Sequence, residues 1–247
     1  MTEPYYQDDR VTLYHGDCRE ITEWLEADVL VTDPPYGIPG GRLGSHRTGV
    51  RQVHADADWD SLEIRDEALA LWGDRPRAVF GTIKMHDAAP AHRGVPLVWD
   101  KGDSPGMGDY TWPFGASYEL VWINGDGWTG PRRNSVLRFD HSSSRATTVG
   151  HPTPKPVGLM ESIVKYAPSG TVADPFAGSG STLVAAKQLG RAAVGVELEE
   201  RYCEVIAKRL AQPSILTFRN ACARAASEPS DTHQPHATTT AWMRADR

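Results

Sequence analysis

Residues 171–189, TVADPFAGSGSTLVAAKQL, decide how the rest of this chain is expected to fold. A short β-branched run ends at Asp174, a turn containing Gly178 and Gly180 follows, and an Ala- and Leu-rich helical pattern starts at Ser181. Glycines let the backbone approach a ligand closely, and the unpaired N–H groups at the start of the helix point toward that ligand. The stretch therefore predicts a ligand-binding end of a strand-turn-helix unit.

A second strand pattern, residues 192–196, leads directly to Glu197. In nucleotide-binding βαβ units a carboxylate at the end of this strand binds the ribose hydroxyls, so the pair of strands predicts a ligand that carries a ribose. The alternative is a tight strand-to-helix connection without a ligand, because the third glycine of the dinucleotide fingerprint is missing.

A separate apolar strand pattern at residues 29–32 ends in Asp33-Pro34-Pro35-Tyr36. The two prolines lack N–H groups and fix φ, so the backbone is stiff there and offers only carbonyls. A strand that ends in a proline turn would explain Asp-Pro-Pro. It would not explain the tyrosine or the similarity to the Asp-Pro-Phe of the glycine stretch.

The combination resembles a known enzyme family. Asp-Pro-Pro-Tyr at residues 33–36, followed much later by Asp-Pro-Phe-Ala-Gly-Ser-Gly-Ser-Thr at residues 174–182, is similar to the amino-methylating DNA methyltransferases that use S-adenosylmethionine, in the permuted order called the β class. Further matches are His-Gly-Asp at 15–17, His-Pro-Thr-Pro-Lys-Pro at 151–156, Gly-Arg at 190–191 and Gly-Val-Glu at 195–197. Two motifs in the correct order are more specific than either alone.

The resemblance implies an α/β fold: a Rossmann-like methyltransferase domain with a doubly wound, mostly parallel sheet. It also implies that Asp33, Pro34, Pro35 and Tyr36 form the catalytic site. An exocyclic base amine is a poor nucleophile, and the Asp33 carboxylate and Pro34 carbonyl are suited to accept both of its hydrogens. Tyr36 would stack on the flipped base. Direct displacement at the sulfonium methyl needs positioning and electrostatics, and no covalent intermediate.

The same resemblance implies a cofactor site made of Asp17, Thr153, Lys155, Asp174, Phe176, Ala177, Gly178, Ser179, Gly180, Thr182 and Glu197. Asp174 and the glycine turn would hold the methionine end, and Glu197 would bind the ribose. Thr153 and Lys155 match motif residues near the methionine carboxylate, although Pro154 replaces the more usual glutamine.

Asp at position 33 favours adenine N6 in double-stranded DNA as the target, because the Ser-Pro-Pro-Tyr form accompanies cytosine N4 in this family. Cytosine C5 methylation needs a thiol after proline, and the chain has no Pro-Cys pair. Methyltransferases for RNA or protein glutamine remain alternatives, but they generally place the glycine turn before the Pro-Pro-Tyr strand. A DNA-binding relative without turnover is the other alternative.

The net charge of −6 has the wrong sign for a DNA-binding protein, so basic residues must gather on one face. Residues 37–58 have no usable periodicity and are expected to form a mobile basic flap. Residues 124–150 are expected to be an irregular insert that reads DNA. The predicted DNA contacts are Arg42, Arg47, Arg51, Arg132 and Arg133.

Length and composition indicate one domain, which the resemblance implies is a methyltransferase domain at residues 1–210. Residues 211–247 are expected to form a mostly disordered tail, with a possible edge strand at 215–218. Three unclustered cysteines fit a reducing compartment and exclude a disulfide framework or a Cys-rich zinc site. The sequence shows no apolar run of about 20 residues and no leader peptide, so we expect a cytoplasmic protein. A homodimer is possible, but no interface is evident.

Hydrophobic periodicity predicts the remaining elements. Helices are expected at residues 19–26, 62–72, 156–167, 181–189 and 199–210, and strands at 11–14, 29–32, 78–82, 97–99 and 118–123. Asp60 or Ser61 is expected to cap the 62–72 helix. The permuted order predicts that the two ends of the domain lie side by side.

Overall fold

The computed structural model describes residues 2–37, 42–44, 51–53, 61–82, 96–102, 113, 115–140, 151 and 154–212. Residues 1–212 form one compact unit. The predicted tail beyond residue 212, with the edge strand at 215–218, lies outside the described residues.

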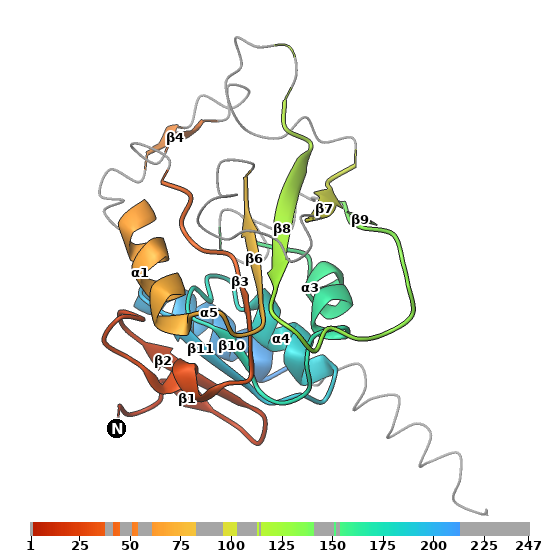
Figure 1. Cartoon of the computed structure of the whole chain (residues 1–247). Coiled ribbons are helices and arrows are strands. Elements are labelled where there is room, and N and C mark those ends of the chain that lie inside the picture. Colours follow the sequence, from red (N-terminus) through yellow and green to blue (C-terminus); the bar gives the residue numbers. More distant parts are fainter. Residues whose placement is uncertain are drawn as a thin grey trace, which may run out of the picture. The chain divides into compact units, whose positions relative to one another are not determined.

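One nine-stranded sheet organises the compact unit, in the order β1-β2-β11-β10-β3-β6-β8-β7-β9 (Figure 1). Its strands are β1 (Tyr6–Gln7), β2 (Val11–His15), β3 (Val29–Thr32), β6 (Arg77–Gly81), β7 (Leu97–Asp100), β8 (Tyr118–Asn124), β9 (Val136–Arg138), β10 (Val172–Asp174) and β11 (Ala193–Glu197). Five of the neighbouring pairs are parallel, and the pairs β1–β2, β6–β8 and β7–β8 are antiparallel. The predicted mostly parallel sheet is confirmed.

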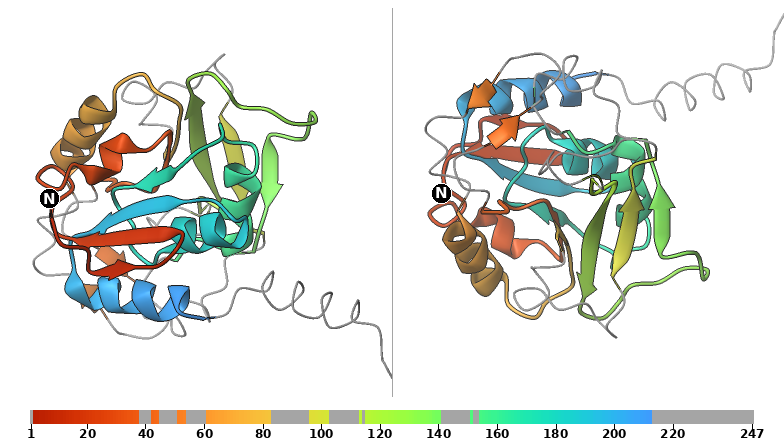
Figure 2. Two further views of the ribbon diagram at one scale, coloured as in Figure 1. Left: turned by 90° about the horizontal axis from the view of Figure 1, so that it is seen from below. Right: turned by 90° about the horizontal axis from the view of Figure 1, so that it is seen from above.

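Helices cover both faces of this sheet, as Figure 2 shows for α5 and α1 on opposite sides of the strands. The helices are η1 (Glu23–Glu26), α1 (Leu62–Trp72), α3 (Val157–Val164), α4 (Ser181–Gln188) and α5 (Glu200–Leu210). On one face Leu159, Leu183 and Ile206 of the last three helices are fully buried in one core cluster. On the other face Trp24 and Trp72 stack, with ring centroids 5.8 Å apart. The fold is therefore doubly wound.

The direction of the strands decides which residues can meet. β2, β11, β10, β3, β6 and β7 all run the same way, so their carboxyl ends lie along one edge, here called the site edge. β8 is antiparallel to its neighbours, so it starts at the site edge with Tyr118 and ends at the opposite edge, where Asn124 pairs with Arg77. The beginning of β8 therefore lies beside the ends of the parallel strands.

One sequence expectation is wrong, and strands occur in two segments that were expected to lack regular structure. Residues 19–26 form only the short η1, because backbone N–H groups of Glu20 and Ile21 bond to the Asp17 carbonyl in a turn and delay the helix. The described part of the 37–58 flap is an antiparallel hairpin, β4 (Arg42–Gly44) with β5 (Arg51–Val53). The insert is not wholly irregular either, because β9 pairs with β7.

The other predicted elements agree with the structure to within a few residues, although α3 ends at Val164. The Ser61 side chain caps α1 by accepting from the Glu63 N–H at 3.1 Å. The Lys187 ammonium donates to the Asp8 carboxylate at 2.6 Å and to the Leu210 carbonyl at 2.7 Å, so the start and the end of the unit lie side by side as predicted. In the described part of the chain, no helix combines the length and apolar character of a membrane span.

Candidate active site

Asp33 and Tyr36 follow β3 directly and interact with each other at the site edge. The Tyr36 hydroxyl donates a hydrogen bond of 2.6 Å to Asp33 Oδ1 and lies 3.3 Å from Glu119 Oε2. The two intervening prolines fix φ, which helps to hold this short loop in one conformation. The tyrosine ring is half-buried, and the Lys155 ammonium lies 5.8 Å from its centroid.

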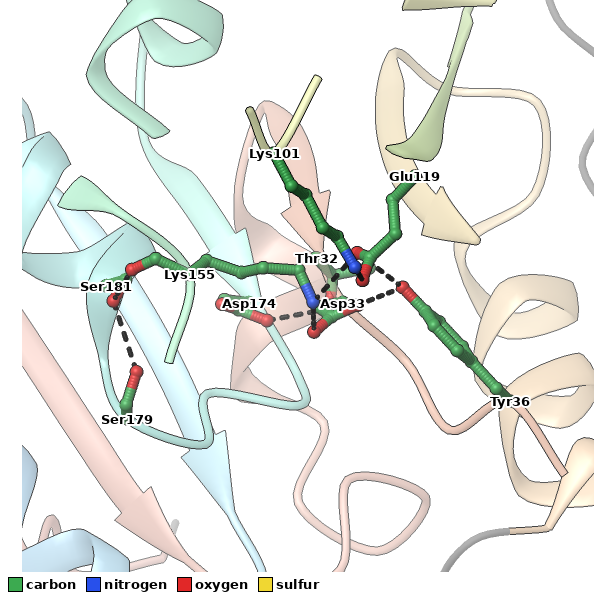
Figure 3. A network of polar contacts seen from close by, with 9 residues as sticks. All are labelled: Thr32, Asp33, Tyr36, Lys101, Glu119, Lys155, Asp174, Ser179 and Ser181. Atoms are coloured by element: carbon green, nitrogen blue, oxygen red, sulfur yellow. Dashed lines mark hydrogen bonds and ion pairs between the residues drawn. The ribbon is translucent and has the colours of Figure 1, made fainter. Parts of the chain in front are cut away.

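Four charged side chains form one cluster beside this tyrosine, here called the charge cluster: Asp33, Glu119, Lys155 and Lys101 (Figure 3). The Lys155 ammonium pairs with Asp33 Oδ2 and lies 3.2 Å from Glu119 Oε2. Lys101 Nζ donates to Glu119 Oε1 at 2.6 Å. Two positive and two negative groups therefore balance one another in a setting where the Lys155 side chain is only 9 % exposed.

The cluster controls the protonation of its members. Burial raises the pKa of Asp33, and the nearby Glu119 carboxylate adds to this effect, although Lys155 opposes it. Burial alone would raise the pKa of Glu119, but Lys155 and Lys101 lower it to about 2. Burial and both carboxylates raise the pKa of Tyr36 well above its ordinary value. Glu119 is therefore ionised and Tyr36 is neutral at physiological pH.

The glycine turn between β10 and α4 is tied to the end of β11. Gly178 has φ +53°, and its N–H donates to Glu197 Oε2 at 2.7 Å. The other Glu197 oxygen accepts from the Glu199 N–H at 2.9 Å. Gly180 has φ +76°, and a Cβ there would lie 2.9 Å from Ile206. Gly178 thus presents its backbone to Glu197, whereas Gly180 is needed for close packing against α5.

Asp174 joins the same turn to β3. Its Oδ1 accepts from the Thr32 hydroxyl at 2.7 Å and from the Phe176 N–H at 3.2 Å, and the residue is 3 % exposed. Burial raises the pKa of Asp174 to about 6 and that of Glu197 to about 7. Two buried carboxylates with elevated pKa values at one sheet edge are typical of a functional site.

The predicted cofactor residues gather at this edge with one notable departure. Ala177, Ser179 and Thr182 are buried around the turn, and Phe176 is half-buried. Asp17 follows β2 and is held by Arg19 at 2.6 Å, which lowers its pKa. Lys155 departs from the expectation, because its ammonium is directed to Asp33. Thr153 lies outside the described residues.

Of the five arginines predicted to contact DNA, Arg132 and Arg133 have described side chains. Arg132 and Arg133 follow β8 at the edge opposite Asp33, and Arg133 lies over the Tyr166 ring at 5.0 Å. This placement argues against their contacting DNA whose base is bound at Asp33. Arg42 and Arg51 belong to β4 and β5, but their side chains and Arg47 lie outside the described residues.

Sequence reasoning missed Glu119 and Lys101. The available signal was a carboxylate inside the otherwise apolar strand pattern YELVWIN and a lysine directly after LVWD. Only the antiparallel direction of β8 brings Glu119 to the site edge, and nothing in the local sequence specifies this direction.

A parallel sheet whose site edge carries a glycine turn, a buried glutamate after the next strand and an Asp-Pro-Pro-Tyr loop defines the fold class of S-adenosylmethionine-dependent methyltransferases. Residues 90–209 match the family model of N6 and N4 methyltransferases, described as DNA methylase. This match and the curated relatives both support an amino-methylating DNA methyltransferase family for the chain. The matched range includes the glycine turn and Glu119 but not Asp33.

Curated relatives are similar in sequence to this chain over most of their length. The chain is 27% identical to the Type II methyltransferase M2.LlaDCHI of Lactococcus lactis subsp. cremoris, covering 85% of this chain and 93% of that protein. It is 24% identical to the Type II methyltransferase M.ScaI of Streptomyces caespitosus, covering 85% and 84%.

Solved structures share the fold. The M1.HpyAVI complex with SAM has a TM-score of 0.57 at 23% identity, covering 81% of this chain and 99% of that one. The PvuII DNA methyltransferase, described as cytosine-N4-specific, has a TM-score of 0.59 at 18% identity, covering 90% and 93%. These similarities do not distinguish adenine N6 from cytosine N4.

Proposed function

We propose that this protein transfers the methyl group of S-adenosylmethionine to N6 of adenine in double-stranded DNA, and that it acts in the cytoplasm. One observation carries the proposal: Asp33 and Tyr36 lie at the end of β3, directly beside the β10 strand that leads into the glycine turn. A base amine bound at Asp33 and a methyl donor bound at the turn would therefore meet at the same edge.

The residues around Asp33 have the chemistry that amine methylation requires. The amine gains nucleophilicity when the Asp33 carboxylate and the Pro34 carbonyl accept its two hydrogens. Tyr36 offers an aromatic face, and stacking of about 1–3 kcal/mol per base offsets part of the cost of flipping the base out of the duplex. The bound S-adenosylmethionine supplies a methyl group on a positively charged sulfur.

The cofactor contacts are part of the proposal. Glu197 accepts a hydrogen bond from the Gly178 N–H. Its remaining lone pairs are suited to accept a second hydrogen bond from a ribose hydroxyl. The Gly178 turn and Asp174 would hold the methionine end, and Asp17 would lie near the adenine. Lys155 is reassigned to the charge cluster because its ammonium is bound to Asp33 and Glu119.

DNA would approach the site edge. The flap with Arg42, Arg47 and Arg51 leaves from the loop that contains Asp33, and the chain after β9 leaves from the same edge at Arg138. These two segments are our candidates for contacting DNA, and they replace Arg132 and Arg133. A homodimer would double this surface, and analytical ultracentrifugation would detect it.

Cytosine N4 is the second candidate product, because the cytosine-N4-specific PvuII enzyme shares the fold. The test is to incubate the protein with S-adenosylmethionine and unmethylated genomic DNA, digest the DNA to nucleosides and analyse them by mass spectrometry. N6-methyladenine is the expected product. Only N4-methylcytosine would refute the choice of base, and transfer only to RNA or to protein would refute DNA as the substrate.

A further inference from the structure

Glu119 lies within reach of both groups that bind the Asp33 carboxylate. The Tyr36 hydroxyl is 2.6 Å from Asp33 Oδ1 and 3.3 Å from Glu119 Oε2. The Lys155 ammonium binds Asp33 Oδ2 and lies 3.2 Å from the same Glu119 Oε2. One oxygen of Glu119 is thus an alternative acceptor for both donors.

The rest of Glu119 is fixed in place. Its Oε1 accepts from Lys101 Nζ at 2.6 Å, and its side chain is only 16% exposed. Among the described residues, the titratable groups that face it are Lys101 from the end of β7, Lys155 from the segment before α3, and Asp33 and Tyr36 from the loop after β3. Glu119 is therefore an anchored and charged acceptor at the start of β8.

Asp33 cannot polarise an amine well while it serves these two donors. An oxygen that is paired with an ammonium has much of its charge neutralised, which makes it a weaker acceptor for a neutral amine. The Tyr36 hydroxyl likewise occupies the other oxygen. Each Asp33 oxygen keeps a lone pair, but a base amine would meet a stronger acceptor if at least one donor moved to another partner. That partner must lie nearby, because an unpaired buried donor is costly.

We propose that Glu119 is a positioning residue that takes the Tyr36 hydroxyl and the Lys155 ammonium from Asp33 when the target base enters. This exchange rests on the proposed function, because it assumes that Asp33 accepts from the base amine. Lys101 supports the exchange by keeping Glu119 in place and ionised.

The test is a double-mutant cycle of Glu119→Gln with Tyr36→Phe. The single-turnover rate is measured with excess enzyme as incorporation of tritiated methyl from S-adenosylmethionine into unmethylated genomic DNA. We expect Glu119→Gln to slow transfer at least tenfold in the wild-type background. We expect a clearly smaller factor in the Tyr36→Phe background, because one of the two donors to be exchanged is already absent. The exchange would be overturned if Glu119→Gln slowed transfer by the same factor in both backgrounds. It would also be overturned if the Glu119→Gln single variant had a rate within twofold of wild type.

A pH profile separates this role from a merely structural one. Lys101→Met should raise the pKa of Glu119, so the acidic limb of the rate profile should move to higher pH while the rate at high pH recovers. A uniform loss at every pH would overturn the role assigned to the Lys101–Glu119 pair. The wild-type arm reports on the proposed function itself. If the wild type transfers no methyl to DNA, both proposals fail, whereas an active wild type with equal factors refutes only the exchange.

Discussion

Lys155 and Asp33, 122 residues apart in sequence, form a partly buried ion pair at the site edge. The lysine belongs to the His-Pro-Thr-Pro-Lys-Pro segment and the aspartate to Asp-Pro-Pro-Tyr, so the pair joins two of the motifs that define the family resemblance. Its position links the segment before α3 to the loop that holds the proposed catalytic residues.

This pair gives the first prediction. Lys155→Met should reduce methyl transfer by at least about tenfold, since it leaves Lys101 as the one described cation that balances Asp33 and Glu119, and it should leave the affinity for S-adenosylmethionine nearly unchanged. It should also lower stability, by less than the about 3–5 kcal/mol that is usual when a fully buried pair is broken, because the Asp33 side chain is partly exposed. Calorimetric titration and denaturant unfolding measure these effects. Lys165→Met on the exposed end of α3 is the matched control. A large loss of cofactor affinity would instead restore the methionine-carboxylate role.

Asp33→Asn should lower methyl transfer by at least about 100-fold, within the usual range for loss of a positioned proton acceptor. Cofactor affinity should change little, because Asp33 lies on the base side of the site edge. Rates of methyl incorporation and calorimetric titration test this, with exposed Asp126→Asn at the opposite edge as the control. A weakened cofactor with normal transfer would contradict the assignment.

Glu197→Gln should show the opposite pattern. Cofactor binding should weaken by about 1.5–3 kcal/mol, the usual contribution of a hydrogen bond to a charged group. Transfer at saturating cofactor should be less affected. Because Glu197 also binds the Gly178 and Glu199 N–H groups, circular dichroism must first show that the variant is folded. Unchanged affinity in the folded variant would remove Glu197 from the cofactor site.

Two pKa values predict how the unliganded protein responds to pH. Asp174 and Glu197 have folded-state pKa values raised to about 6 and about 7, so the folded state binds more protons than the unfolded state between about pH 4 and 7. Their contribution to stability is present below the unfolded pKa values and is lost as pH rises through about 6 to 7. Cofactor affinity should rise over pH 6–8 as Glu197 ionises. Thermal unfolding and titration at several pH values test both trends, which Glu197→Gln should flatten.

Double variants of two arginine pairs distinguish between the two candidate DNA-binding surfaces. Arg42→Ala/Arg51→Ala in the β4–β5 hairpin should weaken binding to all duplexes and reduce the salt slope by about 0.9 per lost phosphate contact. Arg132→Ala/Arg133→Ala should leave affinity unchanged, because these residues lie at the opposite edge. Fluorescence anisotropy across a salt series measures both. The reverse result would return the DNA surface to residues 124–135.

The sequence by itself determined most of the elements and the edge on which the site lies. Alternation, apolar runs and glycine turns are local signals, and parallel strands necessarily bring Asp33, Asp174 and Glu197 to the same edge. The prediction of a helix over residues 19–26 was wrong because a turn at Asp17 takes up the first residues of the helical pattern.

Only the tertiary structure decided which side chains complete that edge. The direction of β8 depends on long-range pairing with β6 and β7, and it brings Glu119 to Asp33 while it carries Arg132 and Arg133 to the far end of the sheet. The partner of Lys155 was likewise undetermined, because a long side chain binds whichever carboxylates the packing leaves within its reach. Local patterns specify strands and turns, whereas contacts between distant segments specify the charges around the catalytic aspartate.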